Sequence, residues 1–336
     1  MKPSTWLGPS DTSDAGRKPA RPSAGRPARG VELISLSDVN EIELLILKRM
    51  REFAIGEHSS LFHGSGFDFT GLRDWQAGDR PESIDWAQSS LTNFSPLIVR
   101  EFEQPSTSSV VIVADASRST RCGAGDVPIA TIVARAIATL GMSAVFFQDS
   151  IALVTFQDRF ERLNGLPARI GKNQVIHCLD AYTATALSSI APQHGPPELK
   201  RADTLSGTLA GFMRKTSMVP VVSDFLFDDA SEVLGELAQL NSLHDVFVGL
   251  VDASFAFEVP SVSAGWVEAY DVETGRTRVM SRADLRKAAE RVRSWQDTVA
   301  RQARELGLDV MRLPLDQTQF DIALMEFVVA RRLRRK

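Results

Sequence analysis

The sequence predicts an α/β fold, in which a doubly wound, mostly parallel sheet is preceded by a small N-terminal segment packed on it. From residue 108 onward, short β-branched runs alternate with stretches of helical spacing. This alternation is typical of right-handed strand–helix–strand crossovers, which place helices on both faces of a parallel sheet. The first run, Val110 to Ala114, is continuously apolar, as strands buried on both faces are.

The helices are identified by apolar residues at three- and four-residue steps. Residues 31–53 carry such a stripe ahead of the sheet. A proline at an allowed first-turn position opens the helix expected at 128–141. Gly307 ends a long helix whose apolar stripe runs over residues 285–306. The other helices are expected at residues 173–182, 204–215, 230–240 and 320–333.

The strands are short apolar runs that lie between the helical stretches. Residues 188–202 are rich in proline, serine and glycine and are expected to form a loop. No repeat of 20–50 residues is visible. After the first run, strands are expected at residues 151–156, 219–223, 244–251, 266–270 and 309–313.

The composition divides the chain into three parts. Residues 1–30 form a basic tail, rich in proline, glycine and serine, with a net charge of +4. Such a segment cannot bury enough apolar surface to offset the entropy lost on ordering, so we expect it to be disordered. Residues 31–107 contain the N-terminal helix and a segment rich in aromatic residues and glycine. Residues 108–335 form the α/β domain.

Composition and charge exclude several classes of protein. Of the 336 residues, 43% are hydrophobic, and the net charge of −4 gives no polycationic surface for nucleic acid. The two cysteines, Cys122 and Cys178, cannot build a disulfide framework or a four-thiolate zinc site. The longest mostly apolar run without a charge, residues 136–148, has 13 residues, whereas a membrane-spanning helix needs about 20. We therefore expect a cytoplasmic protein without a secretory signal or transmembrane segment.

Two loops carry oxygen-bearing side chains directly after predicted strands. Asp115, Ser117 and Ser119 follow the first strand, and Asp224 follows the strand at 219–223. Because ligands gather beyond the carboxyl ends of strands in an open α/β sheet, these side chains are expected to meet around one cation. Hard oxygen ligands favour Mg²⁺ or Mn²⁺. The alternative is that both aspartates only cap the helices that follow them.

The two loops resemble the metal-ion-dependent adhesion site of von Willebrand factor A-like domains. That site consists of an Asp-x-Ser-x-Ser loop, a threonine on a second loop and an aspartate on a third. The resemblance implies a Rossmann-type fold with the metal ligands Asp115, Ser117, Ser119 and Asp224. Thr204 takes the threonine position if the second loop shifts by one residue. Aligning the leucines that follow this threonine in the family puts Asp203 there instead.

A longer motif lies ahead of the sheet, at residues 64–79 and 83–86. It reads Gly-Ser-Gly-Phe-Asp-Phe-Thr-Gly-Leu-Arg-Asp-Trp-Gln-Ala-Gly-Asp and then Ser-Ile-Asp-Trp. This motif is similar to the signature that precedes the A-like domain in a bacterial family catalogued only as a domain of unknown function. Genes of that family typically accompany MoxR-type AAA+ ATPases. The resemblance therefore implies such an ATPase, or a client protein delivered to it, as the partner.

The signature is expected to be structural. Its glycines allow tight turns, and its large apolar side chains are expected to pack together. Arg73, Asp79 and Asp85 could form a charge-assisted network; the alternative is a hydrolytic site that uses Asp79 and Asp85 as acid and base. The signature residues are Phe69, Gly71, Arg73, Trp75, Gly78, Asp79, Asp85 and Trp86.

The leading functional hypothesis is a non-enzymatic adaptor that captures a partner's carboxylate through the cation. The predicted site loops carry no general base, phosphate clamp or second carboxylate cluster. This favours binding over the enzymatic alternative, a metal-dependent phosphohydrolase or nuclease that uses Asp115 and Asp224. A third alternative is a metal-free structural scaffold, which is favoured if Asp203 replaces the threonine.

Overall fold

The computed structural model describes residues 33–55, 68–76, 79, 81–103, 108–124, 127–157, 160–187, 196–257, 266–270, 277–315 and 317–334. The basic tail at residues 1–30 and Gly78 of the signature lie outside the described residues. The chain divides into two compact units, a small one of Leu47–Thr107 and a large one of Met1–Ile46 with Ser108–Lys336. The large unit contains both candidate cation-binding loops, and the small unit contains the signature.

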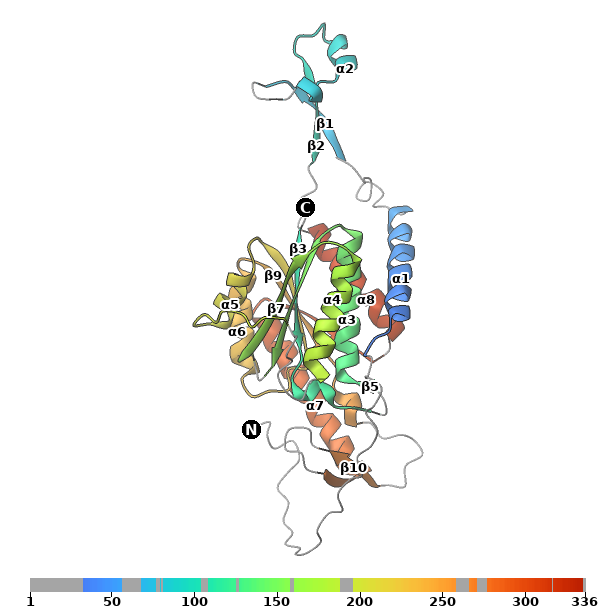
Figure 1. Ribbon diagram of the computed structural model, residues 1–336, viewed down its shortest axis with the longest axis vertical. Helices are drawn as coiled ribbons and strands as arrows, with labels where there is room; N and C mark the ends of the chain where they lie inside the picture. The colour runs from blue at the N-terminus through green and yellow to red at the C-terminus, as the bar shows by residue number, and fades with distance from the viewer. Residues whose placement is uncertain are drawn as a thin grey trace, which may run out of the picture. The chain divides into compact units, whose positions relative to one another are not determined.

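The large unit is built on a six-stranded sheet with the order β12–β9–β8–β3–β6–β7 (Figure 1). All neighbouring strands are parallel except β7, which runs antiparallel to β6 at one edge. The central strands β3, β8 and β9 are buried along their whole length, which confirms the predicted α/β fold with a mostly parallel sheet. The strand bounds are β3 Ser109–Asp115, β6 Ser150–Gln157, β7 Arg162–Arg169, β8 Ser217–Ser223, β9 Asp245–Val251 and β12 Asp309–Leu313.

Helices cover both faces of this sheet (Figure 1). α3, α4 and α8 lie on one face, and the first half of α1 belongs to the same unit, where Glu43 forms an ion pair with Lys172 of α4. α5, α6 and α7 share the apolar core on the other face. The helix bounds are α1 Leu36–Ile55, α3 Ile129–Phe146, α4 Lys172–Leu187, α5 Leu205–Phe212, α6 Ala230–Asn241, α7 Arg282–Glu305 and α8 Gln317–Arg334.

α3 is the central helix of its face. Among the described residues it is the one helix that is long and apolar enough to cross a membrane, and 83% of that stretch is buried inside the protein. Burial of this extent is typical of a core helix.

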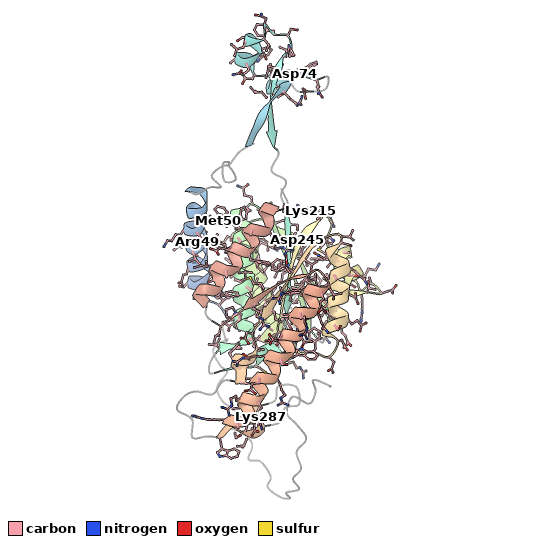
Figure 2. The ribbon with its side chains drawn as sticks, turned by 180° about the vertical axis from the view of Figure 1, so that it is seen from behind. Arg49, Met50, Asp74, Lys215, Asp245 and Lys287 are labelled. Carbon is pink, nitrogen blue, oxygen red and sulfur yellow. The ribbon has the colours of Figure 1, made fainter. Side chains whose placement is uncertain are left out.

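The order of the strands creates a switch point in the middle of the sheet. From β3 the chain runs to β6 and β7 on one side, and it then returns to β8, β9 and β12 on the other. The carboxyl ends of β3 and β8 therefore border the place where the strand order reverses, and open α/β sheets bind ligands there. Figure 2 shows Asp245 at the amino end of β9 and, at the opposite end of the large unit, Lys287 near the start of α7.

Parts of the large unit differ from the sequence prediction. The sequence pattern predicts no strand at β7, because its buried and exposed residues do not form a continuous apolar run. The strand expected at 266–270 forms as β10 (Trp266–Tyr270), but it pairs with β11 (Thr277–Ser281) in a separate hairpin. α4 also continues beyond the predicted end, to Leu187.

The small unit is a two-stranded antiparallel sheet with a short insertion. β1 (Asp68–Asp74) pairs with β2 (Ile98–Glu103), and the register is irregular between Phe69 and Gly71. A 3-10 turn, η3 (Pro81–Ser83), and a short helix, α2 (Trp86–Leu91), lie between the two strands in sequence. The described part of the signature therefore supplies one strand of the hairpin and the start of the inserted helix.

Candidate functional site

The first candidate loop begins at the last residue of β3. The Asp115 side chain is 1% exposed. Its Oδ1 accepts a hydrogen bond from the backbone N–H of Ser117 at 2.9 Å, and its Oδ2 accepts one from the Ser223 hydroxyl at 2.5 Å. Burial raises the pKa of Asp115, and the hydrogen bonds from Ser117 and Ser223 oppose that rise. Donors from two neighbouring strand ends therefore fix the orientation of this carboxylate.

The two serines of this loop lie side by side. Ser117 Oγ and Ser119 Oγ are 2.9 Å apart, and both residues are half-buried. The 3-10 turn η4 (Arg118–Arg121) brings these alternate residues together, and the Thr120 hydroxyl closes the turn by donating to the Ser117 carbonyl at 2.8 Å. Two hydroxyl oxygens thus meet next to the Asp115 carboxylate, as their spacing predicts.

Asp224 lies directly after β8, at the neighbouring strand end. Its side chain is 1% exposed, and its Oδ1 accepts from the Leu226 backbone N–H at 3.0 Å. The register pairs Ala114 with Val222, so the residues that follow, Asp115 and Ser223, are neighbours across the two strands. Asp224 is the next residue in the chain after Ser223. The sheet therefore brings the two predicted loops together at the carboxyl ends of the central strands β3 and β8. We call this end of the sheet the edge.

Tyr182 of α4 connects this edge to the helix layer. It is fully buried, and its hydroxyl donates to the backbone carbonyl of Asp115 at 2.9 Å. Burial raises the pKa of Tyr182 well above its ordinary value, and the negative charges of Asp115 and Asp224 raise it further. Both carboxylates therefore lie close enough to act on the same phenol.

Thr204 occupies a different setting from the other predicted ligands. It is the N-cap of α5: its Oγ1 accepts from the Gly207 backbone N–H at 3.0 Å and lies 3.2 Å from the Ser206 hydroxyl. Within the described residues, no hydrogen bond joins Thr204 to Asp115 or Asp224. Thr204 and Asp203 both line a pocket of about 270 Å³ between α5 and α6. The structure therefore gives Thr204 a capping role.

The expected alternative, that the two aspartates only cap helices, is wrong. The N-cap of α3 is Pro128 and that of α6 is Asp229. Asp115 and Asp224 instead each accept a hydrogen bond from the backbone N–H two residues further on, within their own loops. Their burial at the switch point therefore needs another explanation.

The side chains at this edge are oxygen donors, the type of ligand that a hard divalent cation prefers. Within the described ranges of the chain, no group of three or more His, Cys, Asp or Glu side chains could hold a metal ion. The edge instead offers two carboxylates and two hydroxyls, oxygen ligands that suit Mg²⁺ when the cation keeps several water molecules. The residues that would hold the cation are Asp115, Ser117 and Ser119, with Asp224 at the adjoining strand end.

A comparison with protein families matches residues 71–304 to the family described as "Protein of unknown function DUF58". The match spans more than half of the chain. The chain belongs to the DUF58 family. This confirms the resemblance to a family known only as a domain of unknown function. The matched range contains both strand-end loops and most of the signature.

Two solved structures resemble this DUF58 protein. One is the conserved hypothetical protein BatB from Bacteroides thetaiotaomicron, with 15% identity and a TM-score of 0.39, covering 66% of this chain and 98% of that one. The other is an aerotolerance-related membrane protein from Bacteroides fragilis, with 13% identity and a TM-score of 0.32, covering 59% and 99%. Both TM-scores are too low to bear on the fold or function of this chain. No curated protein matches it in sequence.

The charged residues of the DUF58 signature form a compact arrangement in the small unit. The Arg73 guanidinium binds both carboxylate oxygens of Asp79, each at 2.7 Å, and the Gln76 backbone N–H donates to Asp79 at 2.8 Å. These bonds lower the pKa of Asp79 to about 2. Asp85 is the N-cap of α2 and accepts from the backbone N–H groups of Ala87 and Gln88. Of the predicted network of Arg73, Asp79 and Asp85, the Arg73–Asp79 ion pair is present, and Asp85 is the N-cap of α2, a role that was not predicted.

The tryptophans of the signature are not core residues in the structure. Trp75 is 41% exposed and Trp86 is 60% exposed. The expectation that they pack into an aromatic core is therefore wrong. The reason is local: Trp75 follows the end of β1, and Trp86 is the first residue of the short helix α2. Phe69 and Gly71 lie in β1, on either side of its irregularity.

Two residues of the edge were not identified from the sequence. The Ser223 hydroxyl donates to Asp115. The sequence feature that could have identified Ser223 is its place at the end of an apolar run, because a parallel register aligns it with the end of the run that contains Asp115. Tyr182 contacts the Asp115 backbone from α4. No local motif marks Tyr182, because its role depends on how a distant helix packs against the sheet.

Proposed function

We propose that this DUF58 protein is a non-enzymatic, protein-binding adaptor with a von Willebrand A-like domain. A divalent cation, Mg²⁺ or Mn²⁺, would be held by Asp115, Ser117, Ser119 and Asp224, with Thr204 or Asp203 completing the site. The observation that carries the proposal is the buried Asp115 carboxylate beside the paired Ser117 and Ser119 hydroxyls. This group lies at the switch point of the sheet, where α/β folds bind ligands.

The chemistry of the edge supports binding of a partner's acidic side chain. A cation held there would supply an open coordination position, which a Glu or Asp of another protein can fill. Arg118 lies between the two serines and is exposed, so a positive charge stands at the rim of the loop. The resemblance of the signature to that of MoxR-associated proteins supports a MoxR-type AAA+ ATPase, or its client, as the protein that supplies the carboxylate.

Titration of the purified protein with Mn²⁺ by calorimetry tests the cation site. We expect one site in the wild-type protein and none in Asp115→Ala, because the variant lacks the carboxylate that accepts from Ser117 in the loop that carries both hydroxyls. A thermal unfolding curve checks that the variant is folded. Equal binding by wild type and variant would contradict the proposed site.

The remaining ligand is assigned by a pair of neighbouring variants. Loss of Mn²⁺ affinity in Thr204→Ala but not in Asp203→Ala assigns the threonine, and the reverse result assigns the aspartate. Thr204→Ala also removes the cap of α5, at a cost of about 1 kcal/mol. Thermal unfolding must therefore accompany the titration, so that a loss of affinity is not confused with a loss of fold.

Two outcomes would replace the proposal. Metal-dependent phosphatase or nuclease activity that disappears in Asp224→Ala would indicate the enzymatic alternative. Wild-type protein that binds no divalent cation at millimolar concentration would indicate a metal-free scaffold, in which Asp115 serves to join β3 and β8 through Ser223.

A further inference from the structure

Asp224 begins a turn that its own side chain closes, because its Oδ1 accepts from the Leu226 backbone N–H at 3.0 Å. Phe225, the next residue, has a φ of +53° and is fully buried. A bulky side chain rarely adopts this left-handed backbone conformation, and such a conformation persists only where the surrounding structure enforces it. The contacts of the turn show what enforces it here.

Ser223 ties the turn to the first candidate loop. Its Oγ accepts a hydrogen bond from the Phe225 backbone N–H at 2.9 Å and donates one to Asp115 Oδ2 at 2.5 Å. Because the hydroxyl accepts from Phe225, its own proton is available for the Asp115 carboxylate. One buried hydroxyl thus fixes the orientation of Asp115 and the backbone after Asp224 together.

Two consecutive residues of α7 also bind the backbone of this turn. Trp295 Nε1 donates to the Phe225 carbonyl at 2.8 Å. The buried Gln296 side chain donates to the Asp224 carbonyl at 3.0 Å and to the Val251 carbonyl at 2.7 Å. The carbonyl groups of Asp224 and Phe225 are therefore both bound by α7.

We propose that Ser223, Trp295 and Gln296 are positioning residues that hold Asp115 and Asp224 in the geometry that binds the cation. We call these three residues the clamp. This inference rests on the proposed function, because it assigns the clamp a role toward the same cation. Preorganised ligands bind more tightly than ligands that must be ordered on binding. Removing a clamp hydrogen bond should therefore weaken cation binding while every proposed ligand remains in place.

The test measures Mn²⁺ affinity by calorimetry in the full-length protein. We expect Ser223→Ala to weaken binding at least fivefold and Ser223→Thr, which keeps the hydroxyl, to restore most of it. Trp295→Phe removes the indole N–H that donates to the Phe225 carbonyl, together with part of the ring, and should also weaken binding. It serves as the second variant if Ser223→Ala does not fold.

Thr155→Val is the matched control. Thr155 is a fully buried residue near the end of β6, paired with Ala114 of β3 and so facing away from Asp115. Its hydroxyl finds no hydrogen-bond partner among the described residues. Removing this hydroxyl should therefore leave the affinity for Mn²⁺ unchanged. If Thr155→Val also weakens binding, the effect of Ser223→Ala comes from losing a buried hydroxyl in general and not from losing the clamp.

A second readout needs no metal. The Phe225 amide should exchange with solvent deuterium faster in Ser223→Ala than in wild type, since its acceptor is gone. Unchanged exchange, or wild-type affinity in both Ser223→Ala and Trp295→Phe, would overturn the clamp while leaving the cation site standing. Wild-type protein that binds no Mn²⁺ would overturn the proposed function, and the positioning role with it.

Discussion

The Arg73–Asp79 pair shows how one side chain organises a turn. Asp79 accepts both guanidinium N–H groups and the Gln76 backbone N–H, so it closes the segment that follows β1. Arg73, through these hydrogen bonds, is the main cause of the lowered pKa of Asp79, about 2 instead of 3.8. A carboxyl group whose pKa is lower in the folded state than in the unfolded state stabilises the fold at pH values above the unfolded pKa. This stabilisation is lost as the pH falls through the folded pKa.

We therefore predict that the turn after β1 loses stability between about pH 4 and pH 2. The Gln76 amide proton, which donates to Asp79, should report this titration by NMR with a midpoint near pH 2. In Arg73→Ala the midpoint should move toward 3.8. A wild-type midpoint near 3.8 would show that the pair is not formed in solution.

The residues of the candidate site could be predicted where they share one short loop or, like Asp224, directly follow a continuous apolar strand. Asp115, Ser117 and Ser119 lie within one short loop, so spacing alone shows that their side chains can meet. Ser223 and Tyr182 reach Asp115 from another strand and from a helix. Their roles follow from strand register and helix packing, neither of which a single sequence specifies.

At the scale of elements, a buried charged group joins α8 to α3. Arg135 of α3 donates to Asp321 of α8 at 2.6 Å and 3.0 Å, and the Thr139 hydroxyl donates to the other carboxylate oxygen at 2.7 Å. Asp321 is 2% exposed. Burial raises the pKa of Asp321, although the hydrogen bonds from Arg135 and Thr139 oppose this. These two donors therefore stabilise the buried carboxylate.

We predict that Arg135→Ala lowers the free energy of unfolding by about 3–5 kcal/mol, because it leaves a buried carboxylate without its counter-charge. The double variant Arg135→Met with Asp321→Leu should be less destabilised than Arg135→Ala, since neither charge is then buried alone. Denaturant unfolding of the three proteins measures both effects. Equal stability of wild type and Arg135→Ala would mean that the pair is not buried in solution.

The exposed tryptophans lead to a second prediction for an element, the hairpin of the small unit. Trp75→Ala and Trp86→Ala should each change the free energy of unfolding by about 0.5 kcal/mol or less, as surface substitutions do, and not by the 3–5 kcal/mol typical of buried aromatics. Val99→Ala in β2 is the control, because Val99 is buried in the same unit and should cost more than either. Thermal unfolding of the full-length variants measures these differences. A large loss for either tryptophan would show that its ring is buried in solution.

For the whole molecule, the sheet was predictable because its central strands are continuous apolar runs separated by amphipathic helices. Val110–Ala114 is buried on both faces, as a short continuous run of mostly β-branched residues predicts for a strand of a parallel sheet. The edge strand β7 and the β10–β11 hairpin were not predictable in the same way, because strands outside the core carry mixed patterns. The proposed adaptor function can be tested on the whole chain through its partner.

The last prediction concerns that partner and involves the whole chain. A cation bound at Asp115 would present one exchangeable position to solvent, so affinity for another protein would be concentrated on a single carboxylate contact. The proposed source of that carboxylate is a MoxR-type AAA+ ATPase or its client. We predict that the full-length protein recovers such an ATPase from a lysate of the source organism. EDTA or Asp115→Ala should each reduce recovery at least tenfold.

Tenfold corresponds to about 1.4 kcal/mol, a small loss for a coordinated carboxylate, so the threshold is a lenient one. Thr155→Val provides the control, since it alters a buried hydroxyl on the other face of the sheet and should recover the ATPase as well as wild type does. Recovery that resists both EDTA and Asp115→Ala would place the ATPase contact elsewhere in the chain and leave the cation for a client protein. Failure to recover any ATPase, with Mn²⁺ binding intact, would remove the partner from the proposal and keep the site.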